Sequence, residues 1–149
     1  MKHHKPTVEG FQNFVTNVMQ IPETALPVGS EWISEAFHIA HALVYRAIRG
    51  VSPLLYREAV YNLAASILIQ YCPDQPGYTF FADYRKSHGI GTFTPGVISS
   101  SSDNGTSQSW LNADFMKNLT LSDLDNLKNP YGLAYLKIAH DMGAIWGLT

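Results

Sequence analysis

The fold is decided by the stretch SPLLYREAVYNLAASILIQY, residues 52–71. A serine cap followed by proline at the first helical position begins a helix here, and Pro73 ends it. The polar side chains form one narrow stripe with a spacing of four: Glu58, Asn62, Ser66 and Gln70. Almost every other position is apolar, so we expect this helix to be covered on most sides. The pattern predicts the central helix of the domain, or a helix packed against a neighbouring subunit.

Two further helices are predicted before this stretch. The first is a short amphipathic helix from Val8 to Met19, which ends in the segment 21–27 because its two prolines cannot continue it. The second covers residues 30–49, capped by Ser30 and followed by Gly50 after its C-cap. Its core-facing residues have the spacing of one buried helix face: Ile33, Ala36, Phe37, Ala40, Val44, Ala47 and Ile48.

Three helices are predicted after the central stretch. One extends from Pro76 to about Lys86, and a short helix with a capping-box-like start covers Thr120 to Leu127. The last begins near Pro130 and ends at Gly143. The chain shows no internal repeat.

Two segments lack helical patterns. Residues 88–109 form an arm rich in Gly, Ser and Thr, part of which fits a short β-hairpin around the Asp103–Gly105 turn. Residues 143–149 form an apolar tail without charge. We therefore predict a mainly α fold, with residues 1–149 as a single helical domain: a bundle of about five helices, a long Ser/Gly-rich arm and an extended C-terminal tail. An arm that is costly to order alone and an apolar tail that needs cover together indicate a part of an assembly. The alternative for the tail is that it folds back on the core of its own chain.

Composition excludes several classes of function. The net charge of −2 argues against a free-standing nucleic-acid binder and against binding to an anionic membrane, since both usually need a basic excess. Charged residues make up only 15% of the chain, and with eighteen aromatic residues this indicates a second buried surface, such as a subunit contact. The sequence has no run of roughly 20 apolar residues and no secretory signal after its basic N-terminus, so we expect a cytosolic product.

Motifs for catalysis are absent from the sequence. Gly89 and Gly91 lack the third glycine of a phosphate-binding loop, and there is no nucleophile elbow and no zinc-protease or zinc-deaminase motif. The lone Cys72, next to Pro73, favours a structural thiol. We therefore expect no enzyme activity and no cofactor.

The best metal candidate is the pair His38 and His41, spaced i, i+3 on one predicted helix, with Tyr45 one turn further on. A metal would need a third ligand, such as His140 or Asp141. The alternative is that both histidines lie on the flank of a helix that meets another helix or subunit. We favour this alternative because the sequence offers no matched second pair of ligands.

A basic set lies near predicted helix ends: Arg46, Arg49, Arg57, Arg85 and Lys86. Interaction with helix dipoles and surface pairing is the simplest explanation. The functional alternative is a modest contact with DNA phosphates or with the acidic rim of a partner, made by Arg46, Arg49, Arg85 and Lys86.

Four stretches stand out in the second half of the chain: GVISSSSDNGTS at 96–107, LTLSDL at 119–124, PYGLAYL at 130–136 and WGLT at 146–149. Together with the predicted helix pair at 30–50 and 52–71, they resemble the head–tail connector proteins (adaptor, or head-completion proteins) of tailed bacteriophages. The resemblance extends from about Trp32 to the end of the chain.

The resemblance implies a virion structural protein whose copies form a ring, commonly dodecameric. The ring would join the portal of the DNA-filled head to the next neck or tail protein and extend the DNA channel. DNA would pass through its lumen without sequence-specific binding, and no membrane would be involved. The portal-docking tail would be Ile145, Trp146 and Leu148. The arm residues that contact adjacent subunits or the next ring would be Gly96, Val97, Ile98, Ser99, Asp103, Gly105 and Thr106.

Alternatives remain open. One is another neck or tail-completion protein, although tail terminators tend to be α/β. A second, from a different class, is a small metal-dependent helical enzyme that uses His38, His41 and His140. A helical nucleic-acid-binding regulator is disfavoured by the net charge. The main hypothesis places the protein in the virion neck, after synthesis in the host cytoplasm.

Overall fold

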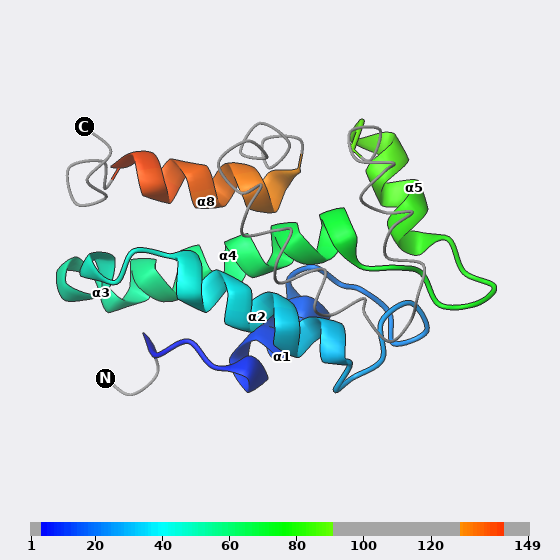
Figure 1. Cartoon of the computed structure of the whole chain (residues 1–149), viewed down its shortest axis with the longest axis horizontal. Helices are drawn as coiled ribbons and strands as arrows, with labels where there is room; N and C mark the ends of the chain where they lie inside the picture. The colour runs from blue at the N-terminus through cyan, green and yellow to red at the C-terminus, as the bar shows by residue number, and fades with distance from the viewer. Residues whose placement is uncertain (1–3, 91–128, 142–149) are drawn as a thin grey trace.

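The computed structural model describes residues 4–90 and 129–141, and this part of the chain is helical (Figure 1). The predicted mainly α bundle is confirmed. The helices of the described part are α1 (Val8–Asn17), α2 (Glu31–Leu43), α3 (Ala47–Val51), α4 (Pro53–Tyr71), α5 (Phe80–Ser87) and α8 (Pro130–Asp141). The arm beyond residue 90, the helix predicted at 120–127 and the tail at 143–149 lie outside the described residues.

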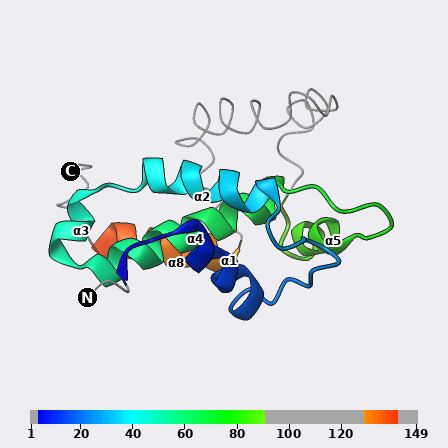
Figure 2. The ribbon, with the colours of Figure 1, turned by 90° about the horizontal axis from the view of Figure 1, so that it is seen from below.

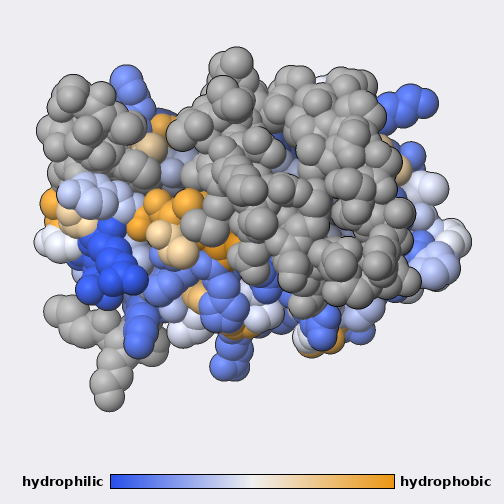
Figure 3. Space-filling view, viewed as in Figure 1, coloured by the Kyte–Doolittle hydropathy of each residue, from blue (hydrophilic) through white to orange (hydrophobic). Residues whose placement is uncertain are grey.

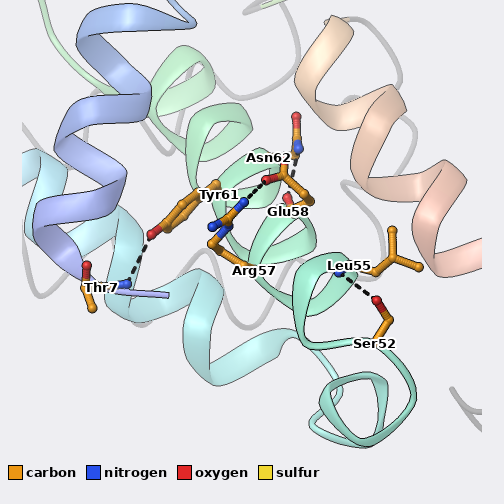
Figure 4. Close-up of polar contacts among 7 residues, drawn as sticks. All are labelled: Thr7, Ser52, Leu55, Arg57, Glu58, Tyr61 and Asn62. Atoms are coloured by element: carbon orange, nitrogen blue, oxygen red, sulfur yellow. Dashed lines mark hydrogen bonds and ion pairs between the residues drawn. The ribbon is translucent and has the colours of Figure 1, made fainter. Parts of the chain in front are cut away.

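Helix α4 is the centre of the bundle, as predicted. Every residue from 59 to 70 is buried, and α1, α2, α3, α5 and α8 all contact this helix (Figures 1 and 2). Its start follows the predicted signal, because Ser52 Oγ accepts a hydrogen bond from Leu55 N at 3.2 Å and Pro53 occupies the first turn (Figure 4). Full burial of each large apolar side chain stabilises the fold by roughly 1.5–3 kcal/mol, so α4 supplies much of the core.

Two members of the polar stripe of α4, Asn62 and Ser66, are buried and hydrogen-bonded within the protein. Asn62 Nδ2 donates to Glu58 O at 2.8 Å (Figure 4). Ser66 Oγ accepts from Asn129 Nδ2 at 3.1 Å, while Asn129 Oδ1 accepts from Gly132 N at 2.8 Å. Asn129 therefore caps α8 and ties its first turn to the middle of α4.

An aromatic cluster joins α1 and α2 to α4. The ring centroids of Phe11, Phe14 and Phe37 lie 5.7–6.5 Å from that of Tyr61. The Tyr61 hydroxyl oxygen also accepts a hydrogen bond from Thr7 N at 3.2 Å, just before α1 begins (Figure 4). Aromatic pairs add roughly 0.5–1.5 kcal/mol each to the effect of burial, so this cluster fixes α1 on the bundle.

The single long helix predicted over residues 30–49 is wrong, because the chain forms two helices there. Helix α2 ends at Leu43, and Val44 takes an extended backbone with φ −69° and ψ 131°. Both Val44 and Ile48 are buried, so the break keeps these two side chains in the core while the chain turns toward the start of α4. Gly50 consequently lies inside α3 instead of following a C-cap.

The helix predicted from Pro76 begins later, at Phe80. Gly77 has a φ of +84°, a left-handed conformation that favours glycine and that a right-handed helix through this position does not allow. The Asp74 carboxylate accepts hydrogen bonds at 2.6 and 3.0 Å from two backbone N–H groups in the first turn of α5. The start of α5 is therefore set by a carboxylate cap from the loop.

Substitution of Gly10 by alanine tests the aromatic cluster. A Cβ at this position of α1 would overlap the Tyr61 hydroxyl oxygen, and Tyr61 is buried among the other rings. We expect Gly10→Ala to lower the free energy of unfolding in urea by about 1–3 kcal/mol, although alanine favours helix more than glycine does.

Gly50→Ala is the matched control. In the described part of the chain, a Cβ built at Gly50 in α3 meets no atom within 4 Å beyond its chain neighbours and its own helix backbone. Alanine should therefore leave the free energy of unfolding unchanged or raise it by up to about 1 kcal/mol. Equal changes in stability for the two variants would contradict the close packing of Tyr61 on α1.

Candidate functional site

The structure describes the predicted basic residues and the candidate metal ligands, but not the predicted tail and arm residues. Outside the described residues lie the tail residues Ile145, Trp146 and Leu148 and the arm residues Gly96, Val97, Ile98, Ser99, Asp103, Gly105 and Thr106. The four basic residues do not share one surface. Arg46 and Arg49 lie at α3, by the start of α4, whereas Arg85 and Lys86 lie in α5, beyond the end of α4 (Figure 1).

Arg85 has a structural role in the fold, and its predicted contact with DNA or with a partner's rim stays a prediction. Its Nε donates to Ile69 O at 2.7 Å, and its Nη2 donates to Cys72 O. The guanidinium carbon lies 6.0 Å from the centroid of the Phe81 ring. Arg85 therefore satisfies carbonyl groups at the C-terminus of α4, where a cation is also favoured by the helix dipole. Lys86, the next residue, is exposed, and its predicted contact stays a prediction.

Cys72 has the environment of a structural thiol. It is 1% exposed at the end of α4, and burial raises its pKa to about 12, with Asp74 acting in the same direction and Arg85 against it. A thiol with this pKa holds almost no thiolate near neutral pH, and the thiolate is the nucleophile in cysteine chemistry.

The α3 end of the bundle carries exposed apolar and cationic side chains. We define the α3 surface as Tyr45, Arg46, Arg49, Val51 and Leu54. Val51 is 59% exposed and Leu54 44% exposed. In the described part of the chain, neither Arg46 nor Arg49 forms an ion pair, and the Arg49 guanidinium lies 6.0 Å from the centroid of the Tyr56 ring. In Figure 3 the deepest blue on the visible face, which marks strongly hydrophilic residues, lies at this end.

Sequence reasoning identified the two arginines of this surface but missed its apolar members. A signal was present, because Val51 and Leu54 flank the Ser-Pro start of α4, a position where apolar side chains gain little from the core. A shallow hollow lined by residues 42–46 lies where α2 gives way to α3. Tyrosine and arginine are enriched at protein interfaces, so the α3 surface has the composition of a contact surface.

His41 lies beside the α3 surface and has a perturbed pKa. Its ring stacks on Phe37 at 5.6 Å and meets Tyr56 edge-on at 6.2 Å. Burial lowers the pKa of the imidazole, and the nearby positive charges of Arg46, His38, Arg49 and Lys5 lower it further. The cationic groups of α2, α3 and the N-terminal segment therefore gather at this one end of the bundle.

The described histidines are not grouped with other metal-ligating side chains. Among residues 4–90 and 129–141, no three His, Cys, Asp or Glu side chains come together in a group that could hold a metal ion. The absence of such a group applies to His38, His41 and His140, which the metal-dependent alternative requires as ligands. The stacking of His41 on aromatic rings supports the flank position expected from the sequence.

Comparisons of the chain with protein-family models, with curated proteins and with solved structures found no match. None of the helices in the described ranges is long and apolar enough to cross a membrane. The α3 surface carries cations beside exposed apolar side chains, which suits a partner that offers apolar groups and negative charge.

Replacing Arg85 tests its structural role. Arg85→Gln would leave Ile69 O and Cys72 O without their charged donor, so we expect the free energy of unfolding in urea to fall by about 2 kcal/mol or more. The matched control is Lys86→Gln on the exposed side of α5, which should change stability by less than about 0.5 kcal/mol. A neutral Arg85→Gln would contradict the proposed capping of α4.

The lowered pKa of His41 predicts a loss of stability in acid. Above the unfolded-state pKa of about 6.5 the imidazole is neutral in both states. Below it the unfolded chain gains the proton first, so stability falls as the pH drops through 6.5 toward the lower folded-state pKa. Between pH 7.5 and 5, the Tm of the wild type should therefore fall further than that of His41→Gln. His140→Gln, at an exposed position of α8, should follow the wild type; a parallel fall for all three proteins would refute the assignment.

Proposed function

We propose that this chain is a non-enzymatic structural protein of a tailed-bacteriophage virion, a head–tail connector. Its copies form a ring that docks on the portal, joins the DNA-filled head to the next neck or tail protein, and extends the DNA channel. The proposal places the protein in the virion neck after synthesis in the host cytoplasm. It requires no cofactor and no membrane, and DNA passes through the ring without sequence-specific binding.

The observation that carries the proposal is the α3 surface. Exposed Val51 and Leu54 beside Arg46 and Arg49 form a surface that gains by contact with another protein. A single chain in solution leaves these apolar groups in water, whereas a ring subunit covers them.

The order of the helices adds support. The resemblance implies a helix pair followed by a late helix that begins with a Tyr-Gly pair. Helices α2 and α4 pack against each other, and α8 carries Tyr131 and Gly132 in its first turn and packs on α4. The roles of the arm and of the tail residues Ile145, Trp146 and Leu148 remain as the resemblance implies them.

The proposal predicts a closed ring. Native mass spectrometry of the purified chain over a concentration series should show one large species, near twelve copies if the ring is dodecameric. Negative-stain images of the same sample should show closed rings with an open centre. A chain that stays monomeric at every concentration, or that stops at a compact dimer, would contradict the proposal.

A further inference from the structure

The charges of the N-terminal half of the chain are divided along its length. Residues 6–45 contain no lysine and no arginine, and they carry four acidic residues: Glu9, Glu23, Glu31 and Glu35. The next charged residues are Arg46 and Arg49. The boundary between the two signs falls where α2 gives way to α3.

In the fold, the acidic residues around the start of α2 and the arginines around α3 lie at opposite ends of α2. Helix α2 has 13 residues and is therefore about 20 Å long, with Glu31 in its first turn. Its first turn and the preceding loop lie away from α3 in both views of the ribbon (Figures 1 and 2). We define the α2-start surface as Glu23, Val28 and Glu31. All three are exposed, Val28 by 58%.

The α2-start surface is held in place by contacts on the bundle. Ala25 and Leu26 are each 2% exposed and anchor the loop in the core. Gly29 N donates to Gln12 Oε1 of α1 at 3.2 Å, and Ser30 Oγ accepts from Trp32 N at 3.2 Å. A preorganised surface loses little conformational entropy when it binds.

Helix dipoles account for part of this arrangement. An acidic residue in the first turn of α2 and a basic residue in the last turn of α3 are each favourable within one chain. Dipoles do not account for the apolar side chains, because Val28 at one end and Val51 and Leu54 at the other stay in water. Each end thus carries both exposed apolar side chains and charged residues, with Val28 at one end and Val51 and Leu54 at the other, and the charges of the two ends have opposite sign.

We infer that the α3 surface of one copy docks on the α2-start surface of the next copy. Val51 and Leu54 pack on Val28, while Arg46 and Arg49 face Glu23 and Glu31. The two surfaces differ, so the contact is head-to-tail, and such contacts close into rings when the rotation between copies permits. This inference rests on the proposed ring, for which it supplies the contact between neighbouring subunits.

Charge reversal at each end tests the contact. Arg46→Glu/Arg49→Glu makes both ends acidic, and Glu23→Lys/Glu31→Lys makes both ends basic. Each variant alone should need at least about tenfold more protein for half-assembly in sedimentation velocity, because like charges then meet at every contact. An equimolar mixture of the two should restore assembly, since every contact between unlike copies again joins opposite charges. Misfolding cannot explain this rescue.

The control is Lys137→Glu, an exposed position on α8 outside both surfaces, which should assemble like the wild type. If both charge-reversed variants form rings as readily as the wild type does, the inference is overturned and the proposed ring stands. A wild type that does not associate would overturn both. Rescue in the mixture with open filaments in place of rings would support the contact and contradict the connector function.

Discussion

The whole structure depends on the burial of α4, a helix that has no solvent-facing side from residue 59 to residue 70. An amphipathic helix needs cover on one face, whereas α4 needs cover all round, and in the described part of the chain five other helices contact it. Polar groups buried along this helix and at its C-terminal end are expensive to leave unpaired. Ser52 satisfies the N-terminal end, Arg85 bonds carbonyl groups at the C-terminal end, and Asn129 reaches Ser66 in the middle.

The exposed α3 surface follows from the same requirement. Helix α2 runs back alongside α4, so the chain must reverse direction between them, and it does so through a helix of only five residues (Figure 1). Val44 and Ile48 stay in the core through this reversal, which leaves Arg46, Arg49 and Val51 on the outside. A contact between copies at this point would cover apolar groups that the reversal exposes, without altering the core.

The sequence could predict features that depend on neighbouring residues, but not features that depend on partners distant in the chain. The Ser-Pro start and the proline after α4, together with its continuous apolar pattern, predicted the central helix correctly. The break after Leu43 could not be predicted from the helical spacing of the apolar residues, because Val44 and Ile48 fit the same apolar stripe whether or not the helix is continuous. The capping role of Arg85 depends on partners 13 and 16 residues away, so it appears only in the folded chain. Its neighbour Lys86 has the same charge and remains exposed.

The central claim is that copies of this chain meet head-to-tail, and an engineered disulfide measures this directly. In Val28→Cys/Val51→Cys the two new thiols are exposed, while Cys72 is buried with its pKa raised to about 12 and should take no part. Mild oxidation followed by non-reducing gel electrophoresis and peptide mapping should give a ladder of covalent multimers joined between positions 28 and 51. Absence of intermolecular bonds, or a dimer joined only through two copies of position 51, would contradict the account, because a symmetric dimer pairs like with like.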